Sequence, residues 1–192
     1  MISSSLIGLL WAAWVIYWVV AAADTKMSSR RESRWSRLGH GLPLFVAVLL
    51  IAWPGRHPPA WTAWLLQRFL PLSLAGYWIG LALLVIGLGF SIWARTRLGR
   101  NWSGTVTVKQ DHELVRAGPY RFVRHPIYTG ILLGFVGSAI ALGQWRGLVA
   151  AVLCLYAFLR KIRLEERWMD ETFPGTYAVY RQEVKALIPF VL

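Results

Sequence analysis

The sequence predicts an all-α integral membrane protein with about five transmembrane helices. Over half of its 192 residues are apolar (56%), and they occur in long runs. A soluble domain of this size keeps its apolar residues in short periodic stretches, so the long runs are typical of a membrane protein. The charged residues lie mainly in the segments between the runs. The length is that of one domain.

The apolar runs lie, in chain order, at about 6–23, 42–53, 69–93, 127–142 and 148–159. A hydrocarbon core of about 30 Å needs roughly 20 helical residues, so the third run is long enough and the second, fourth and fifth are marginal. We expect the first run to be retained as a helix, because no basic segment precedes it. Only residues 143–147 separate the last two runs, which predicts a tight helical hairpin that need not cross the whole bilayer.

Charge predicts the topology. Nearly all basic residues lie on segments 24–41 and 94–126 and on the tail after Leu159; the exceptions are Arg56, Arg68 and Arg146. Five crossings place the three basic segments on one side of the membrane. The positive-inside rule makes that side the cytoplasm and places the N-terminus outside, in the inner membrane if the cell is bacterial. The basic segments that give the net charge of +12 would then face anionic lipid headgroups, so no nucleic acid partner is expected.

Small residues predict where helices pack. Gly76 and Gly80 form a GxxxG pair in the third run, and Gly130, Gly134 and Gly137 form a similar stripe in the fourth. Such residues let helix backbones approach closely in a membrane.

No metal site is expected. The four histidines are far apart, and none has a Cys or His partner at helical spacing.

The polar segment before the fourth run carries candidate chemistry. Arg124 and His125 are followed by Pro126, which suits the first turn of a helix because its missing N–H costs nothing there. Arg124, His125 and Tyr128 are thereby placed at the membrane surface. A helix N-terminus there favours an anion such as a carboxylate.

A second polar cluster, at 160–167, continues the fifth helix out of the bilayer. A tight hairpin brings the end of that helix back to the start of the fourth, so we expect Glu165 or Glu166 to lie near His125 and Tyr128. The result would be a pocket half in the headgroup region. The simpler interpretation is a solvated helix face with salt bridges spaced three or four residues apart.

A set of linked motifs spans the C-terminal half. It reads HELV at 112–115, GPY at 118–120, RHPIYTG at 124–130, EE at 165–166, FPGTY at 173–177 and IPF at 188–190. In order and spacing these motifs resemble the isoprenylcysteine carboxyl methyltransferase family, which is related to the phospholipid N-methyltransferases. The resemblance covers about residues 95–192. It divides the chain into transmembrane helices at 1–94 and a cofactor-binding methyltransferase region at 95–192.

The resemblance implies S-adenosylmethionine as the cofactor, in a cytoplasmic pocket formed by the 94–126 loop and the C-terminal tail. The implied cofactor-binding residues are Lys109, His112, Glu113, Leu114, Val115, Tyr120, Arg124, His125, Pro126, Tyr128 and Glu166. Arg124 and His125 suit the carboxylate of this cofactor, and Glu166 suits its ammonium or ribose hydroxyls. Tyr120 and Tyr128 offer aromatic faces to its sulfonium and adenine.

The resemblance also implies methylation of a lipophilic acceptor, either a small molecule or a lipidated group, with an isoprenylcysteine-like carboxylate as the leading choice. The family places a substrate-contacting arginine four residues before the second glutamate, where this chain has Ile162. Arg163 is the neighbouring candidate for that role. A carboxylate acceptor is already ionised, whereas an amine would need a base such as His125 or Glu165.

Three other functions remain open from the sequence. One is N- or S-methylation of a membrane lipid or small molecule. Another is a sterol-reductase-like enzyme that uses a reduced nicotinamide dinucleotide phosphate, whose 2′-phosphate Arg116 and Arg121 could receive. The third is a membrane protein without catalytic activity.

Overall fold

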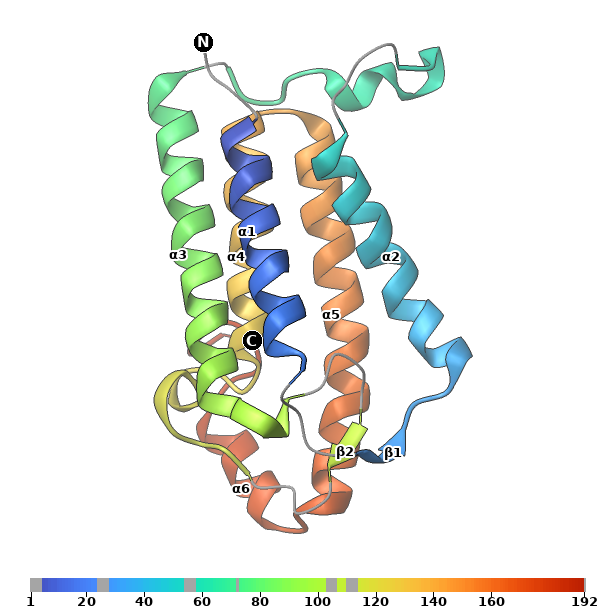
Figure 1. Cartoon of the computed structure of the whole chain (residues 1–192), viewed down its shortest axis with the longest axis vertical. Coiled ribbons are helices and arrows are strands. Elements are labelled where there is room, and N and C mark those ends of the chain that lie inside the picture. The colour runs from blue at the N-terminus through green and yellow to red at the C-terminus, as the bar shows by residue number, and fades with distance from the viewer. Residues whose placement is uncertain are drawn as a thin grey trace.

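The computed structural model describes residues 5–23, 28–53, 58–71, 73–102, 107–109 and 114–191. Within these residues the long helices are α1 (Ser5–Ala21), α2 (Arg34–Ala52), α3 (Leu74–Leu98), α4 (Pro126–Leu142) and α5 (Trp145–Thr172), which lie lengthwise in one bundle (Figure 1). The short elements are β1 (Ser28–Arg31), η1 (Ala60–Leu66), η2 (Gly99–Asn101), β2 (Thr107–Lys109), η3 (Gly118–Arg121) and α6 (Thr176–Glu183). The predicted helical class is confirmed, with a small addition: β1 and β2 pair antiparallel, with Ser28 opposite Lys109.

Helix starts differ from the apolar runs because capping residues set them. α2 begins at Arg34, well before the apolar run, since Ser33 accepts a hydrogen bond from the Ser36 N–H at 3.2 Å. α3 begins at Leu74 rather than near residue 69, because Ser73 caps it in the same way through the Gly76 N–H at 3.0 Å. A serine cap satisfies helix N–H groups that an apolar residue leaves without a partner.

The outer faces of the bundle are apolar. α2 and α3 are each long and apolar enough to cross a membrane, and α1 and α4 are shorter apolar helices of 17 residues each. Large side chains such as Leu9, Val19 and Ile86 lie exposed on these helices. Soluble proteins rarely expose so much contiguous apolar surface, which identifies an integral membrane protein. The number of crossings stays a prediction.

α3 and α4 pack backbone to backbone through glycine. A methyl group on Gly87 would lie 2.5 Å from the Gly130 carbonyl oxygen, and one on Gly80 would lie 2.5 Å from that of Gly137. The predicted stripe in α4 and the role of Gly80 are therefore confirmed. The prediction for Gly76 was wrong, because a methyl there would meet only the Ser73 hydroxyl. Gly87, one helical repeat beyond Gly80, makes the second contact instead.

The predicted hairpin between α4 and α5 is confirmed. Gly143 ends α4 in the left-handed conformation (φ +61°), and Gln144 is the N-cap of α5. A left-handed residue favours glycine because a side chain is strained there.

The start of α5, next to this hairpin, contacts the C-terminus of α2. The buried Arg146 side chain donates to the Trp53 carbonyl at the C-terminus of α2 and to Gln144 Oε1 at 2.7 Å. At the other end of α2, the Arg160 guanidinium covers Gly39 so closely that a methyl there would lie 2.5 Å from Nε. α2 and α5 therefore run antiparallel in a fixed register, and α5 continues past the bundle to Thr172.

Replacing Gly87 by alanine should destabilise the protein, because the methyl group meets backbone that cannot move aside. Overpacking of this kind costs about 1–3 kcal/mol. Gly89→Ala is the matched control: it lies in the same helix with open space around it, and alanine is favoured over glycine in helices by up to about 1 kcal/mol. Thermal unfolding in detergent should rank Gly87→Ala below wild type and Gly89→Ala at or above it. Equal losses in both variants would contradict the packing argument.

Candidate functional site

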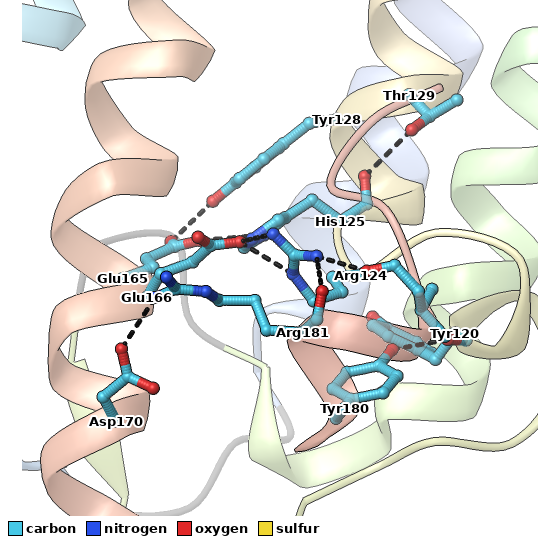
Figure 2. Close-up of polar contacts among 11 residues, drawn as sticks. Tyr120, Arg124, His125, Tyr128, Thr129, Glu165, Glu166, Asp170, Tyr180 and Arg181 are labelled. Atoms are coloured by element: carbon cyan, nitrogen blue, oxygen red, sulfur yellow. Dashed lines mark hydrogen bonds and ion pairs between the residues drawn. The ribbon is translucent and has the colours of Figure 1, made fainter. Parts of the chain in front are cut away.

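The start of α4 and the extension of α5 bring four polar side chains together (Figure 2). His125 Nε2 lies 3.3 Å from Glu166 Oε1, and His125 Nδ1 lies 3.5 Å from Glu165 Oε2. Tyr128 donates its hydroxyl hydrogen to Glu165 Oε1 at 2.6 Å. The prediction that Glu165 or Glu166 lies near His125 and Tyr128 is confirmed for both glutamates.

Arg124 closes the other side of the cluster. Its Nε and Nη2 donate to Glu166 Oε1 at 2.8 and 2.5 Å, and both side chains are mostly buried, with 8% and 15% exposed. Its remaining nitrogen, Nη1, donates to the carbonyls of Arg181 and Val184 at the end of α6. The guanidinium therefore joins α5 to the C-terminal tail.

The tail binds the segment before α4 through main-chain atoms. The N–H groups of Arg124 and His125 donate to the carbonyls of Lys185 and Ala186 at 2.8 and 3.0 Å. The Thr129 hydroxyl donates to the Leu187 carbonyl at 2.7 Å. These contacts hold the backbone of His125 in place. This role of residues 185–187 was not predicted from the sequence, although the IPF motif directly follows them.

Aromatic rings form one wall of the cluster. The Tyr128 ring stacks on the His125 ring with centroids 5.6 Å apart and planes within 4°, and on Phe158 at 4.6 Å and 17°. Lys161 Nζ lies 5.3 Å from the centroid of the Tyr128 ring. A cation over an aromatic face is attracted by the electron density of the ring. The same surface is chemically suited to a sulfonium.

Tyr120 lies deeper than the other predicted ring. Its side chain is buried beside Ala94 and Ile127, and its hydroxyl donates to the Ala94 carbonyl at 3.4 Å. The Tyr180 hydroxyl donates to the Tyr120 carbonyl (Figure 2). Tyr120 thus connects α3, η3 and α6.

The remaining predicted residues fall into two groups. Pro126 is buried at the start of α4, as expected. Leu114 and Val115 are half-buried and precede η3, and Val115 packs against the buried side chains of Ala94, Tyr120 and Ile127. The backbone of Lys109 lies in β2, whereas its side chain, together with His112 and Glu113, lies outside the described residues.

Arg163 is not brought into the cluster. It is exposed on α5, while Ile162 is buried in the core with Phe158 and Leu187. At 3.6 residues per turn, position 163 lies about 60° around the helix from Glu166 and about 160° from Glu165. Arg163 therefore stands at the rim of the cluster rather than inside it.

The charges in the cluster stabilise one another. Burial alone lowers the pKa of His125, but its hydrogen bonds to Glu165 and Glu166 and their charges outweigh burial and raise that pKa above its ordinary value. Burial raises the pKa of Glu166, but hydrogen bonds from His125 and Arg124 outweigh it and lower that pKa. Both shifts favour an imidazolium beside carboxylates.

The donor set suits S-adenosylmethionine. Two carboxylates can receive an ammonium or ribose hydroxyls, and a guanidinium and an imidazole can receive a carboxylate. A sulfonium is a cation, and aromatic rings such as those of this cluster attract cations. Across the part of the chain that the structure describes, no group of three or more His, Cys, Asp or Glu is arranged to hold a metal ion.

Together, the apolar bundle and this buried cluster define a helical membrane protein with a polar site at one end. Residues 75–176, more than half of the chain, match the family model described as phospholipid methyltransferase. The chain belongs to the phospholipid methyltransferase family.

Named relatives agree with this family. The chain is 32% identical over 126 residues to a probable protein-S-isoprenylcysteine O-methyltransferase of Oryza sativa, an alignment that covers 62% of this chain and 66% of that protein. It is 41% identical over 71 residues to methanethiol S-methyltransferase 1 of Bradyrhizobium diazoefficiens, covering 37% of this chain and 24% of that protein. The chain thus matches just under two thirds of the rice relative.

The fold resembles a solved structure, that of the eukaryotic intramembrane Ras methyltransferase, an isoprenylcysteine carboxyl methyltransferase. The TM-score is 0.52 at 22% identity, and the match covers 91% of this chain and 53% of the other. The predicted family resemblance is confirmed by sequence and by fold.

The charge cluster predicts a specific dependence of stability on pH. The contribution of Glu166 is present above the ordinary carboxyl pKa of about 4.3 and is lost as the pH falls through its lowered value. That of His125 is complete below about pH 6.5 and is lost as the pH rises through its raised value.

We therefore expect the thermal unfolding midpoint in detergent to fall as the pH rises from about 6.5 through the raised pKa of His125. In His125→Gln this alkaline decline should be shallower, because the group that loses its proton is absent. Parallel profiles for the two proteins would show that His125 does not carry the effect.

Proposed function

We propose that the protein is an S-adenosylmethionine-dependent methyltransferase that acts on a lipophilic acceptor at the membrane surface. The observation that carries the proposal is the buried set of Arg124, His125, Glu165 and Glu166 at the end of an apolar bundle. Membership of the phospholipid methyltransferase family supports it independently. When bound, the cofactor supplies a methyl group made electrophilic by its sulfonium.

Each residue of the cluster has a proposed role toward that cofactor. Glu166 receives the ammonium or the ribose hydroxyls, and Arg124 and His125 receive the carboxylate. Tyr128 presents its ring to the sulfonium. Glu165 holds the Tyr128 hydroxyl at 2.6 Å and so fixes that ring. Residues 112–115 and Lys109, whose side chains lie outside the described residues except for Leu114 and Val115, complete the proposed pocket.

The leading acceptor is a lipophilic carboxylate, the kind of group that the name of the structurally similar isoprenylcysteine carboxyl methyltransferase specifies. It would enter laterally from the bilayer and attack the methyl carbon in line with the sulfur. A carboxylate is already ionised and needs no base, so the protein contributes positioning and exclusion of water. Positioning alone accounts for up to about 7–11 kcal/mol in favourable cases. Arg163, exposed at the rim, is the proposed cation for the incoming carboxylate.

The proposed topology has five crossings, with the N-terminus outside and the cluster in the cytoplasm. α1 begins at the end of the bundle opposite α6 and the β1–β2 pair (Figure 1). The basic residues of 160–167 and 181–185 lie at the α6 end, where anionic headgroups of the cytoplasmic leaflet would meet them.

The reductase alternative is less well supported. Arg116 is paired with Glu183 and lies 5.0 Å from the centroid of the Tyr180 ring. The Arg121 guanidinium lies 4.6 Å from the centroid of the Phe122 ring. The family match favours a methyl donor over a nicotinamide cofactor.

Calorimetric titration of the purified protein with S-adenosylmethionine and, separately, with reduced nicotinamide dinucleotide phosphate tests the proposal. We expect binding of the first alone. Glu166→Gln should weaken it by about 10-fold to 150-fold, since a hydrogen bond to a charged group contributes about 1.5–3 kcal/mol. Glu171→Gln, an exposed carboxylate on the same helix, is the control and should bind as wild type does. Binding of the nicotinamide cofactor alone would overturn the proposal.

Single cysteines test the topology. With Cys154 replaced by serine, Ala60→Cys and Arg163→Cys place exposed thiols at opposite ends of the bundle. In intact cells a membrane-impermeant maleimide should label Ala60→Cys and spare Arg163→Cys, which should react only after lysis. The reverse pattern would invert the proposed orientation.

A further inference from the structure

Three tryptophans lie along one face of α1. Trp11, Trp14 and Trp18 are spaced three and four residues apart, and their side chains are half-buried. Their rings contact one another in order, with centroids 5.6 Å apart in the first pair and 5.1 Å apart in the second. An indole nitrogen can only donate a hydrogen bond, and a buried one usually has a partner. The stripe therefore places three donors at successive levels of the bundle.

Two of these donors have partners on neighbouring helices. Trp11 Nε1 donates to Ser138 Oγ of α4 at 3.0 Å, and Trp14 Nε1 donates to Ser91 Oγ of α3 at 2.8 Å. Trp18 Nε1 is buried, but among the residues that the structure describes it has no hydrogen-bond partner. A buried donor without a partner destabilises the folded protein. Packing of the ring therefore does not explain the N–H at position 18.

The register of the helices places Trp18 next to the start of α4. α1 and α4 run in opposite directions (Figure 1) and meet where Trp11 contacts Ser138. Two turns further along α1, Trp18 is therefore level with Ile131, which precedes Ser138 by two turns. Tyr128 follows about one turn beyond Ile131, toward the polar cluster. Trp18 thus lies about one helical turn from the ring that the proposed function assigns to the sulfonium.

Side-chain packing agrees with this register. Trp18, Tyr128 and Ile131 all pack against one group of buried side chains, those of Ala94, Tyr120 and Ile127. The indole of Trp18 and the phenol of Tyr128 are therefore separated by a single layer of side chains.

A second buried polar atom near Trp18 has no partner. Asn101 Oδ1, in η2 directly after α3, forms no hydrogen bond with the residues that the structure describes. The next residue, Trp102, has its ring centroid 5.0 Å from that of Trp18. Unsatisfied buried polar atoms are uncommon in folded proteins, and two of them where α1 meets η2 indicate that a further group binds there.

We propose that the indole N–H of Trp18 binds a carboxylate oxygen of the methyl acceptor and so positions the acceptor for transfer. The inference rests on the proposed function, because it deepens the assignment of a lipophilic carboxylate. Val15 and Val19, on the same helix, are exposed on the apolar surface of the bundle, where the hydrocarbon chain of such an acceptor would lie. The Asn101 amide can turn to present its N–H groups to the same carboxylate.

The two carboxylate oxygens have different roles. One forms the new bond to the methyl carbon while the bond from that carbon to the sulfonium sulfur breaks, which leaves a methyl ester and a neutral thioether. The other accepts the hydrogen bond from Trp18, a neutral donor that orients the carboxylate without placing a full positive charge beside it. Because Trp18 Nε1 is covered, binding of the carboxylate has to displace a neighbouring side chain, and Trp102 is the one toward the polar end.

Trp18→Phe and Trp14→Phe remove the same atoms from one helix, but only the second breaks a hydrogen bond within the protein. Trp14→Phe should therefore have the lower unfolding temperature in detergent. Methylation of an S-prenylated N-acetylcysteine should give the opposite ranking. In Trp18→Phe the KM for this acceptor should rise by about 10-fold to 150-fold, the effect of losing one hydrogen bond to a charged group, whereas Trp14→Phe should keep the wild-type KM.

Two further measurements separate acceptor binding from a structural role. Both variants should bind S-adenosylmethionine with wild-type affinity in calorimetric titration. Inhibition by the methyl ester product should change much less in Trp18→Phe than the KM does, because an uncharged ester oxygen is a weaker hydrogen-bond acceptor than a carboxylate.

An unchanged KM in Trp18→Phe, or equal weakening of the acceptor and its ester, would assign the ring to packing alone and overturn the inference. A wild type that binds the donor but does not methylate this acceptor would also overturn it and would leave the cofactor assignment standing. A wild type that does not bind the donor would overturn the proposed function and this inference together.

Discussion

The ion pair between Arg124 and Glu166 is the interaction on which the arrangement of the polar end depends. One guanidinium binds a carboxylate of α5 with two nitrogens and the carbonyls that end α6 with the third. Both charges are mostly buried, and leaving one of them without its partner costs about 3–5 kcal/mol. The main effect of such a pair is to fix the position of its side chains, more than to add net stability. Because Glu166 is held in place, His125 has a carboxylate near each of its two ring nitrogens.

That pair can form only because the apolar bundle brings its partners to one level. The two-residue turn at Gly143 and Gln144 makes α4 and α5 neighbours, and the glycine contacts with α3 fix the position of α4. Because α5 extends beyond the end of the bundle, its charged C-terminal part lies beside the start of α4. The chemistry of the site is thus set by helix length: a shorter α5 would end at its apolar part and leave His125 without its acids.

The sequence was sufficient wherever one strong physical rule applied. Long apolar runs predicted the helices, the short gap at 143–147 predicted the hairpin, and the hairpin in turn predicted that Glu165 or Glu166 meets His125. It failed where several weak rules compete. GxxxG spacing favoured Gly76 over Gly87, although the crossing of α3 and α4 decides which glycines touch. The contact of Glu32 with His40 and the position of Arg163 depend on the rotation of α2 and α5, which hydrophobic runs do not encode.

The way the tail attaches has a consequence for how this site would look across many related sequences. The hydrogen bonds that Lys185 and Ala186 make to Arg124 and His125 use carbonyl oxygens, which every amino acid possesses. These hydrogen bonds therefore depend on the length and path of the tail more than on the identity of its residues. A search that ranks positions by residue identity would pass over this stretch, whereas an insertion or deletion of a single residue there would displace the imidazole at the centre of the site.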